Sequence, residues 1–506
     1  MPASSSSRAL TLVAGVVALL ALLPLAVIVP TALSEGIDGA ADFLLRARIG
    51  RLLGNTGMLM AVTVPTTLVL GTLAAWLVER TDLPGAGLWR TLLLMPLAVP
   101  SFVAAYAWTS LAPGMDGLAG AAVVTVLAYL PFVFLPVAAM LRSLDPGDEE
   151  LARALGLGPV AAVLRTVLPR LRPALAGGAL LVALHLLAEY GVLELMRFQT
   201  FTTAIMQQYA IGFSDVPGSL LALVLLLLCV LALGLEPWLR GGRRVARIGS
   251  GAQRSPVRAR LGAWTAPALA LLALLVGLAV AVPVAMVARW LTTPDALVSI
   301  DLDLLARTGT TVGLAVLGAL AATIAALPGA WLLGRHRSGV AHVLERTTYL
   351  ASALPGVVVG LALVTLAVRW AQPLYQTVAL TVLAYGILFL PRAMVSLRAG
   401  LAAAPPELSE VARSLGAGGP ASLVRVTLPL MAPSVLAGLV LVALAVGTEL
   451  TATLLLAPTG VDTLAISFWR EASALDYAGA APYAATMIAL SVPLTLLLRR
   501  QIVEAR

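Results

Sequence analysis

Long apolar runs separated by short polar loops make up most of the chain. A helix needs about 20 apolar residues to cross the hydrocarbon core of a bilayer. The first run is too long for the apolar part of a secretory signal peptide, so we interpret it as a span. The pattern predicts an all-α, polytopic membrane protein with twelve transmembrane helices, near residues 9–30, 56–78, 91–112, 118–141, 174–196, 217–238, 263–288, 309–333, 347–369, 376–397, 433–457 and 481–498.

Arginines in the polar loops predict the orientation of these spans. The segment from Arg240 to Arg260 contains seven Arg and no acidic residue, and Arg-rich loops stay on the cytoplasmic side of a membrane. Counting spans from this segment places both chain termini in the cytoplasm and residues 34–54 and 458–480 outside. We therefore expect a multi-pass protein of a bacterial inner membrane, surrounded by the lipid bilayer. Binding of the segment to anionic lipid is compatible with the same charges.

The two halves of the chain resemble each other along their whole length and in the same direction. We predict a first six-helix half at 1–239, an Arg-rich linker at 240–262 and a second six-helix half at 263–506. Each half crosses the membrane an even number of times, so both face the same way, and a pathway between them is the natural consequence. Repeated pairs include Thr56-Gly57 with Thr308-Gly309, Pro100 with Pro355, and Ala128-Tyr129 with Ala384-Tyr385.

The strongest match lies in the predicted cytoplasmic loop after the fourth span of each half, at 145–173 and 405–433. In each loop an acid is followed by Ala, Gly and Leu-Pro at identical spacing. Gly can adopt a positive φ where a helix ends, and Pro breaks a helix. The spacing predicts a rigid elbow of two short helices, the second of them broken at its Pro. The positions are Glu150, Ala152, Gly156, Leu168 and Pro169 in the first loop, and Glu410, Ala412, Gly416, Leu428 and Pro429 in the second.

This pattern resembles the EAA loop of binding-protein-dependent ABC importer permeases. The departures are small: Leu151 and Val411 replace the first Ala of the pattern, and Thr166 and Val426 replace its Ile. The resemblance implies the type I importer fold, in which each elbow docks in a cleft of an ATPase subunit. Closure of two ATPases then moves the elbows together and rocks the spans. It also implies an extracytoplasmic binding protein that delivers the substrate.

The ATPase itself must be a separate polypeptide. A Walker A motif requires Lys on the nucleotide phosphates, and the sequence contains no Lys. Two similar elbows favour a homodimer of ATPase subunits as the partner. We expect no cofactor in this chain, because ATP and Mg²⁺ would be bound by those subunits.

Composition limits the other classes of function. Hydrophobic residues make up 60% of the chain and charged residues 11%, against roughly 25% charged in soluble domains. The net charge of +8 is not arranged in a basic stripe with aromatic residues, so we expect no nucleic-acid partner. The sequence has no catalytic constellation and no cluster at metal-ligand spacing, so we expect no enzyme and no resident metal. A twelve-span secondary transporter stays the main competing class, although it would not need paired EAA loops.

Two acids in the fifth spans are candidates for the translocation path. Glu189 and Glu449 each lie twenty residues after the Pro of their EAA loop. An acid within a membrane helix is costly and usually faces a cavity or a partner. We therefore expect Glu189 and Glu449, with their neighbours Tyr190 and Thr448, to line a path for a cation. Hydrogen bonding between packed helices is the alternative role for the two acids.

The substrate is less well determined. The stretches AEYGVLELMRFQTFTTAI at 188–205 and AAPYAA at 480–485 resemble ferric-iron permeases in which both halves are fused. We therefore expect ferric iron as the cargo. Permeases for thiamine, phosphonates and polyamines belong to the same broad group, and these substrates stay open as alternatives.

Overall fold

The computed structural model describes residues 5–34, 36–145, 147–211, 215–240, 258–294, 296, 301–335, 347 and 354–503. Most of the predicted linker falls outside the described residues. Those described form helices joined by short loops, and their only β-pairing is an isolated bridge between Thr81 and Ala259. The all-α fold is therefore confirmed.

The helices of the first half begin and end as follows: α1 Ser5–Ala32, α2 Gly36–Leu44, α3 Ala47–Arg80, α4 Ala86–Leu92, η1 Met95–Ala98, α5 Ser101–Leu111, α6 Gly117–Ser143, α7 Gly147–Ala154, α8 Pro159–Ala162, η2 Val163–Val167, α9 Leu168–Ala188, α10 Gly191–Leu195, α11 Phe201–Ile211 and α12 Asp215–Arg240. Those of the second half are η3 Gly262–Trp264, α13 Thr265–Val276, η4 Gly277–Ala281, α14 Val282–Leu291, α16 Leu302–Arg335, α18 Gly356–Trp370, η5 Gln372–Leu374, α19 Val378–Ala402, α20 Pro406–Ser414, α21 Gly419–Ser422, η6 Leu423–Thr427, α22 Leu428–Gly447, α23 Thr451–Leu456, α24 Leu464–Ser473 and α25 Tyr477–Val503.

Ten helical segments in the described part of the chain are long and apolar enough to cross a membrane. The third predicted span of each half is different. In the first half it bends by 90° between Ala86–Ala98 and Ser101–Leu111, because Pro100 and the extended Val99 before it cannot continue a helix. In the second half, α18 is shorter than a span, and residues 348–353 before it lie outside the described residues.

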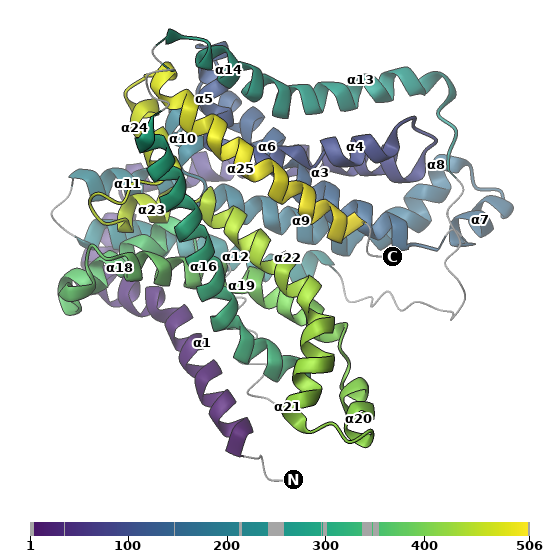
Figure 1. Ribbon diagram of the computed structural model, residues 1–506. Helices are drawn as coiled ribbons and strands as arrows, with labels where there is room; N and C mark the ends of the chain where they lie inside the picture. The colour runs from purple at the N-terminus through teal and green to yellow at the C-terminus, as the bar shows by residue number, and fades with distance from the viewer. Residues whose placement is uncertain are drawn as a thin grey trace. The chain divides into compact units, whose positions relative to one another are not determined.

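The helices gather into two compact units that exchange segments of the two halves. Unit 1 contains Met1–Arg46, Ala204–Leu226 and Trp290–Arg506, and unit 2 contains Ala47–Thr203 and Leu227–Arg289. In unit 1, α1 packs against α16 and α18 of the second half (Figure 1). In unit 2, η4 of the second half packs against α6 and η1 of the first. The first helix of each half therefore packs on elements of the other half.

Small residues form the seam of unit 1. Ala319, Ala322, Ala326 and Ala330 lie buried along α16 against α19 and α22. Small side chains let membrane helices approach closely, and the closer van der Waals packing stabilises their association. Large apolar side chains elsewhere point outward, for example Leu19, Leu231 and Ile324, each about two-thirds exposed. A bilayer would cover these faces without cost.

Candidate coupling elbows and broken spans

The EAA loops fold into two helical elbows of the same geometry. The first elbow is α7 and α8, at the start of α9, and the second elbow is α20 and α21, at the start of α22 (Figure 1). Gly156 and Gly416 both have φ +89°, the left-handed conformation that glycine adopts at helix ends. The amides of Leu157 and Ala417 donate back to the carbonyls of Ala152 and Ala412 at 3.1 and 3.0 Å. The predicted role of the two glycines as helix terminators is confirmed.

The remaining motif residues occupy matching positions in the two elbows. Glu150 and Glu410 are exposed, whereas Ala152 is buried and Ala412 half-buried. Leu168 and Leu428 are both exposed, and Pro169 and Pro429 follow them on the surface. Each elbow therefore presents its acid to solvent and turns its alanine inward.

The predicted helix break at Pro169 and Pro429 is wrong. A five-residue π-helical segment, η2 or η6, precedes each proline and passes directly into α9 or α22. The amide of Leu168 donates to the carbonyl of Val163, and that of Leu428 to Leu423. Each proline then lies in the first turn of the following helix, where its missing N–H is not required. Each elbow is consequently continuous with the span that follows it.

The predicted spans at 174–196 and 433–457 are interrupted. α9 ends at Ala188 and α10 begins at Gly191, while α22 ends at Gly447 and α23 begins at Thr451. All four predicted path residues lie at these two breaks. Tyr190 is the residue before α10, and Thr448 follows α22 and donates to the carbonyl of Leu444 at 3.0 Å. Glu189 and Glu449 stand in the breaks themselves.

Glu189 joins three elements of unit 2 through its carboxylate. Its Oε1 accepts from the amide of Val192 in α10 at 3.1 Å. Its Oε2 accepts from Ser101 Oγ of α5 at 3.0 Å and from the hydroxyl of Tyr129 in α6. The carbonyl of Glu189, left without a helical partner, accepts from Thr202 at 2.6 Å. Ser101 and Tyr129 were not predicted as site residues, because only the folded chain brings α5 and α6 to the break.

Glu449 has the same backbone role in unit 1. Its Oε1 accepts from the amide of Ala452 in α23 at 3.0 Å, and its carbonyl accepts from Thr453 at 2.8 Å. The same Oε1 lies 2.7 Å from where a Cβ would stand on Gly356. Tyr385, the repeat partner of Tyr129, shares a 2.7 Å hydrogen bond with Thr453. The carboxylate therefore occupies space that a side chain at 356 would need.

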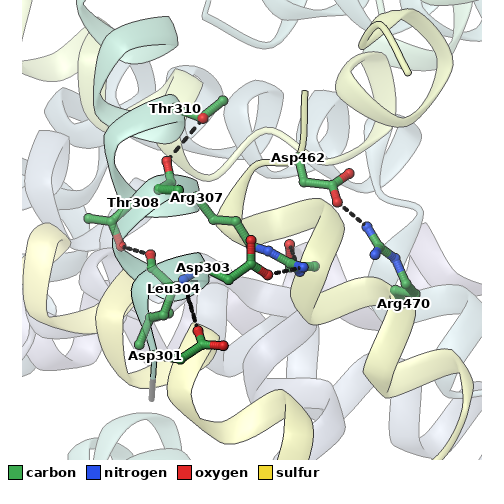
Figure 2. Close-up of polar contacts among 10 residues, drawn as sticks. Asp301, Asp303, Leu304, Arg307, Thr308, Thr310, Asp462 and Arg470 are labelled. Atoms are coloured by element: carbon green, nitrogen blue, oxygen red, sulfur yellow. Dashed lines mark hydrogen bonds and ion pairs between the residues drawn. The ribbon is translucent and has the colours of Figure 1, made fainter. Parts of the chain in front are cut away.

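A charged cluster lies where the start of α16 meets α24 and the loop before it. Arg307 donates to Ser467 Oγ at 2.7 Å and forms an ion pair with Asp303. Arg470 pairs with Asp462 at 2.6 Å, and this hydrogen bond raises the pKa of Arg470. Figure 2 shows both arginines beside their carboxylates, with Asp301 capping the start of α16. The bond from Arg307 to Ser467 connects α16 to α24, and the Arg470–Asp462 pair connects α24 to the loop before it.

Comparison with known proteins agrees with this architecture. The family model described as "Binding-protein-dependent transport system inner membrane component" matches the chain twice, at residues 67–245 and 326–502. The chain belongs to this family. It is therefore an ABC importer permease with two fused copies of the family's membrane component, and a multi-pass protein of the inner membrane. Each match contains one elbow and one broken fifth span.

Individual relatives extend the similarity. The permease is 34% identical to the Fe(3+)-transport system permease protein FbpB 2 of Haemophilus influenzae over 494 residues, covering 96% of this chain and 97% of the relative. It is 29% identical to the sulfate transport system permease protein CysW of Escherichia coli, over 35% of this chain and 67% of that protein. It is 24% identical to the probable ABC transporter permease protein y4fN of Sinorhizobium fredii, over 78% and 77% of the two chains.

Proposed function

We propose that this permease carries ferric iron across the inner membrane, from a binding protein on the outside to the cytoplasm, driven by separate ATPase subunits. The proposed substrate rests on the relative in Haemophilus influenzae. That protein is named as an Fe(3+)-transport permease and is similar to this chain over nearly its full length. The paired elbows support the ATP-driven mechanism, because a secondary transporter has no use for two matched docking helices.

The surface of the elbows supports docking of the ATPase subunits. Leu151 on α7 and Leu155, the residue directly after α7, are 60% and 76% exposed. Val411 on α20 and Leu415, directly after α20, are 56% and 82% exposed, and in each pair the second amide donates to the first carbonyl. Residues four apart lie on one face of a helix, so each elbow carries an exposed apolar pair. Two equivalent pairs fit two equal clefts, which favours a homodimer of ATPases. ATP and Mg²⁺ belong to those subunits, since a chain without Lys cannot form a Walker A motif.

The arginine distribution supports the orientation. With the linker, both elbows and both termini in the cytoplasm, residues 34–54 and 458–480 face outward. The binding protein then meets the side of the permease that bears the Arg470–Asp462 pair of the cluster described above.

The path residues stay a prediction, and we propose that Glu189, Tyr190, Thr448 and Glu449 lie along the route of the cation. The support is their position at two helix breaks, where backbone and side-chain oxygens gather. Oxygen ligands of this kind are suited to hard cations.

The test is uptake by proteoliposomes that contain the permease, its ATPase and its binding protein. We expect ATP-dependent uptake of ferric iron, with no competition from thiamine, a phosphonate or spermidine. Combined Gly156→Val and Gly416→Val should abolish uptake while the protein stays in the membrane, because a β-branched residue at positive φ is strained. Combined Glu189→Gln and Glu449→Gln should slow iron uptake more than ATP hydrolysis. Uptake that proceeds without the ATPase would instead identify a secondary transporter.

A further inference from the structure

An ion-pair network surrounds the end of α3 that lies beside the first elbow. Glu79 and Arg80, the last two residues of α3, are 7% and 3% exposed. Glu79 receives two hydrogen bonds of 2.8 Å from the guanidinium of Arg90 on α4 and lies 3.7 Å from that of Arg142 on α6. Arg80 instead pairs with α7, where its Nη1 lies 3.7 Å from Glu149 Oε2.

The first elbow is held by charge from two sides. Besides Arg80, Glu149 pairs with Arg153 one turn along α7 at 2.7 Å. Its neighbour Asp148 forms an ion pair with Arg170 near the start of α9. α7 is thereby connected to α3 through Glu149 and to α9 through Asp148.

The second elbow cannot form these ion pairs. Leu408 and Ser409 stand where the first elbow has Asp148 and Glu149, and Leu430 stands in place of Arg170. Ser409 instead shares a 3.2 Å hydrogen bond with Thr427, and its carbonyl accepts from Ser422 at 3.4 Å. Both interactions are neutral and stay within the elbow and the π-helical segment that follows it.

The end of the linker is fixed to the same place as the network. The amide of Ala259 donates to the carbonyl of Arg80 at 2.9 Å, and the amide of Asp82 donates to the carbonyl of Ala259 at 3.0 Å. The carboxylate of Asp82 also accepts from the amide of Leu261 at 2.8 Å. These bonds fix the backbone on both sides of Thr81, and with it the position from which the Arg80 side chain reaches α7.

We infer that Arg80 and Glu149 form an electrostatic clamp that couples the first elbow to α3, and that linker residues 259–261 act as a strap that positions Arg80. The inference rests on the proposed function, in which the elbows receive the movement of the ATPases. The two elbows are then unequal: the first moves together with α3, while Ser409, which stands in place of Glu149 in the second elbow, has no carboxylate to form such a pair. Arg80, Glu149 and Asp82 are positioning residues that do not touch substrate or nucleotide.

The clamp is tested by measuring iron taken up per ATP hydrolysed in the reconstituted complex. Glu149→Arg or Arg80→Glu alone should lower this ratio about tenfold, and the double exchange should restore most of it, since contacting residues couple by about 1.4 kcal/mol for such a factor. Glu149→Gln and Asp82→Ala are milder changes in case a buried charge reversal prevents folding, and each should lower the ratio about threefold. Arg240→Gln is the matched control, because it removes a partly exposed ion pair with Glu236 in α12 and should leave the ratio unchanged.

The outcomes separate the clamp from the proposed function. If the unmodified permease shows no ATP-dependent uptake, the proposed function fails. If it does transport, and Glu149→Gln and Asp82→Ala match it in iron per ATP, the clamp is wrong although the proposed function stands. Failure of the double exchange to restore a loss seen in two folded single variants would also exclude direct pairing. Restoration is the result a merely structural role would not give.

Discussion

The two broken fifth spans keep one backbone design but use different side chains. In both, a glutamate caps the amide three residues ahead, and its freed carbonyl accepts a threonine hydroxyl. In the first break, Tyr129 and Ser101 donate directly to the Glu189 carboxylate. In the second, Tyr385 binds Thr453 instead, and Gly356 stands where the first half has Ser101. The two halves therefore share the helix break itself, whereas the side-chain contacts around it have diverged.

Removing the acid at the first break should have the largest effect. Glu189→Ala leaves Val192 N–H, Ser101 and Tyr129 without their acceptor in a buried place, at about 1–3 kcal/mol for each unsatisfied donor. Glu189→Gln keeps an acceptor for Val192 and should cost only about 1 kcal/mol. Thermal unfolding of the detergent-solubilised permease measures the difference. Equal midpoints for the two variants would contradict the junction described for Glu189.

The two tyrosines should differ by a smaller amount. Tyr129→Phe removes a hydrogen bond to a carboxylate, worth about 1.5–3 kcal/mol, whereas Tyr385→Phe removes a bond between neutral groups, worth about 1 kcal/mol. Thr453 still donates to the Glu449 carbonyl when the Tyr385 hydroxyl is absent. The unfolding midpoint should therefore fall further for Tyr129→Phe. A larger fall in the midpoint for Tyr385→Phe would contradict the hydrogen bonds described for the two tyrosines.

The smallest effects are expected where the third span approaches each acid. Ser101→Ala removes one of three donors to Glu189, at about 1 kcal/mol, which is less than for Tyr129 because the bond from Ser101 is only partly buried. Gly356→Ala places a methyl 2.7 Å from Glu449 Oε1, and moving the carboxylate away weakens its bond to Ala452, again at about 1 kcal/mol. Gly386→Ala is a matched control, since its nearest neighbour, Ala321, lies 3.8 Å from the new methyl. If Gly356→Ala is as stable as the control, the Glu449 carboxylate does not exclude a side chain at position 356.

Much of this architecture could be predicted from the sequence, because it depends on local patterns. The elbows, the positive φ of Gly156 and Gly416, and the membrane helices all follow from spacing and residue type. The π-helical segments could not be predicted, since Pro169 and Pro429 have the same local preference whether a helix breaks or only shifts its hydrogen bonds. Ser101 and Tyr129 were missed because their role exists only when three separate spans meet. The exchange of first helices between units leaves no local signal either, because α1 is apolar on most sides.

That exchange has a consequence for biosynthesis. α1 is made long before two of its packing partners, because α16 and α18 begin only at Leu302 and Gly356. Synthesis proceeds at about 5–20 residues per second. α1 therefore lies in the bilayer for on the order of tens of seconds before α16 and α18 are made and can pack against it. A chain stopped at the linker would hold α1 without the two helices of the second half that it packs against, α16 and α18. Two separately synthesised halves would each need the other's first helix to complete folding. Fusion into one chain ensures that each half is made together with one copy of the first helix that packs on it.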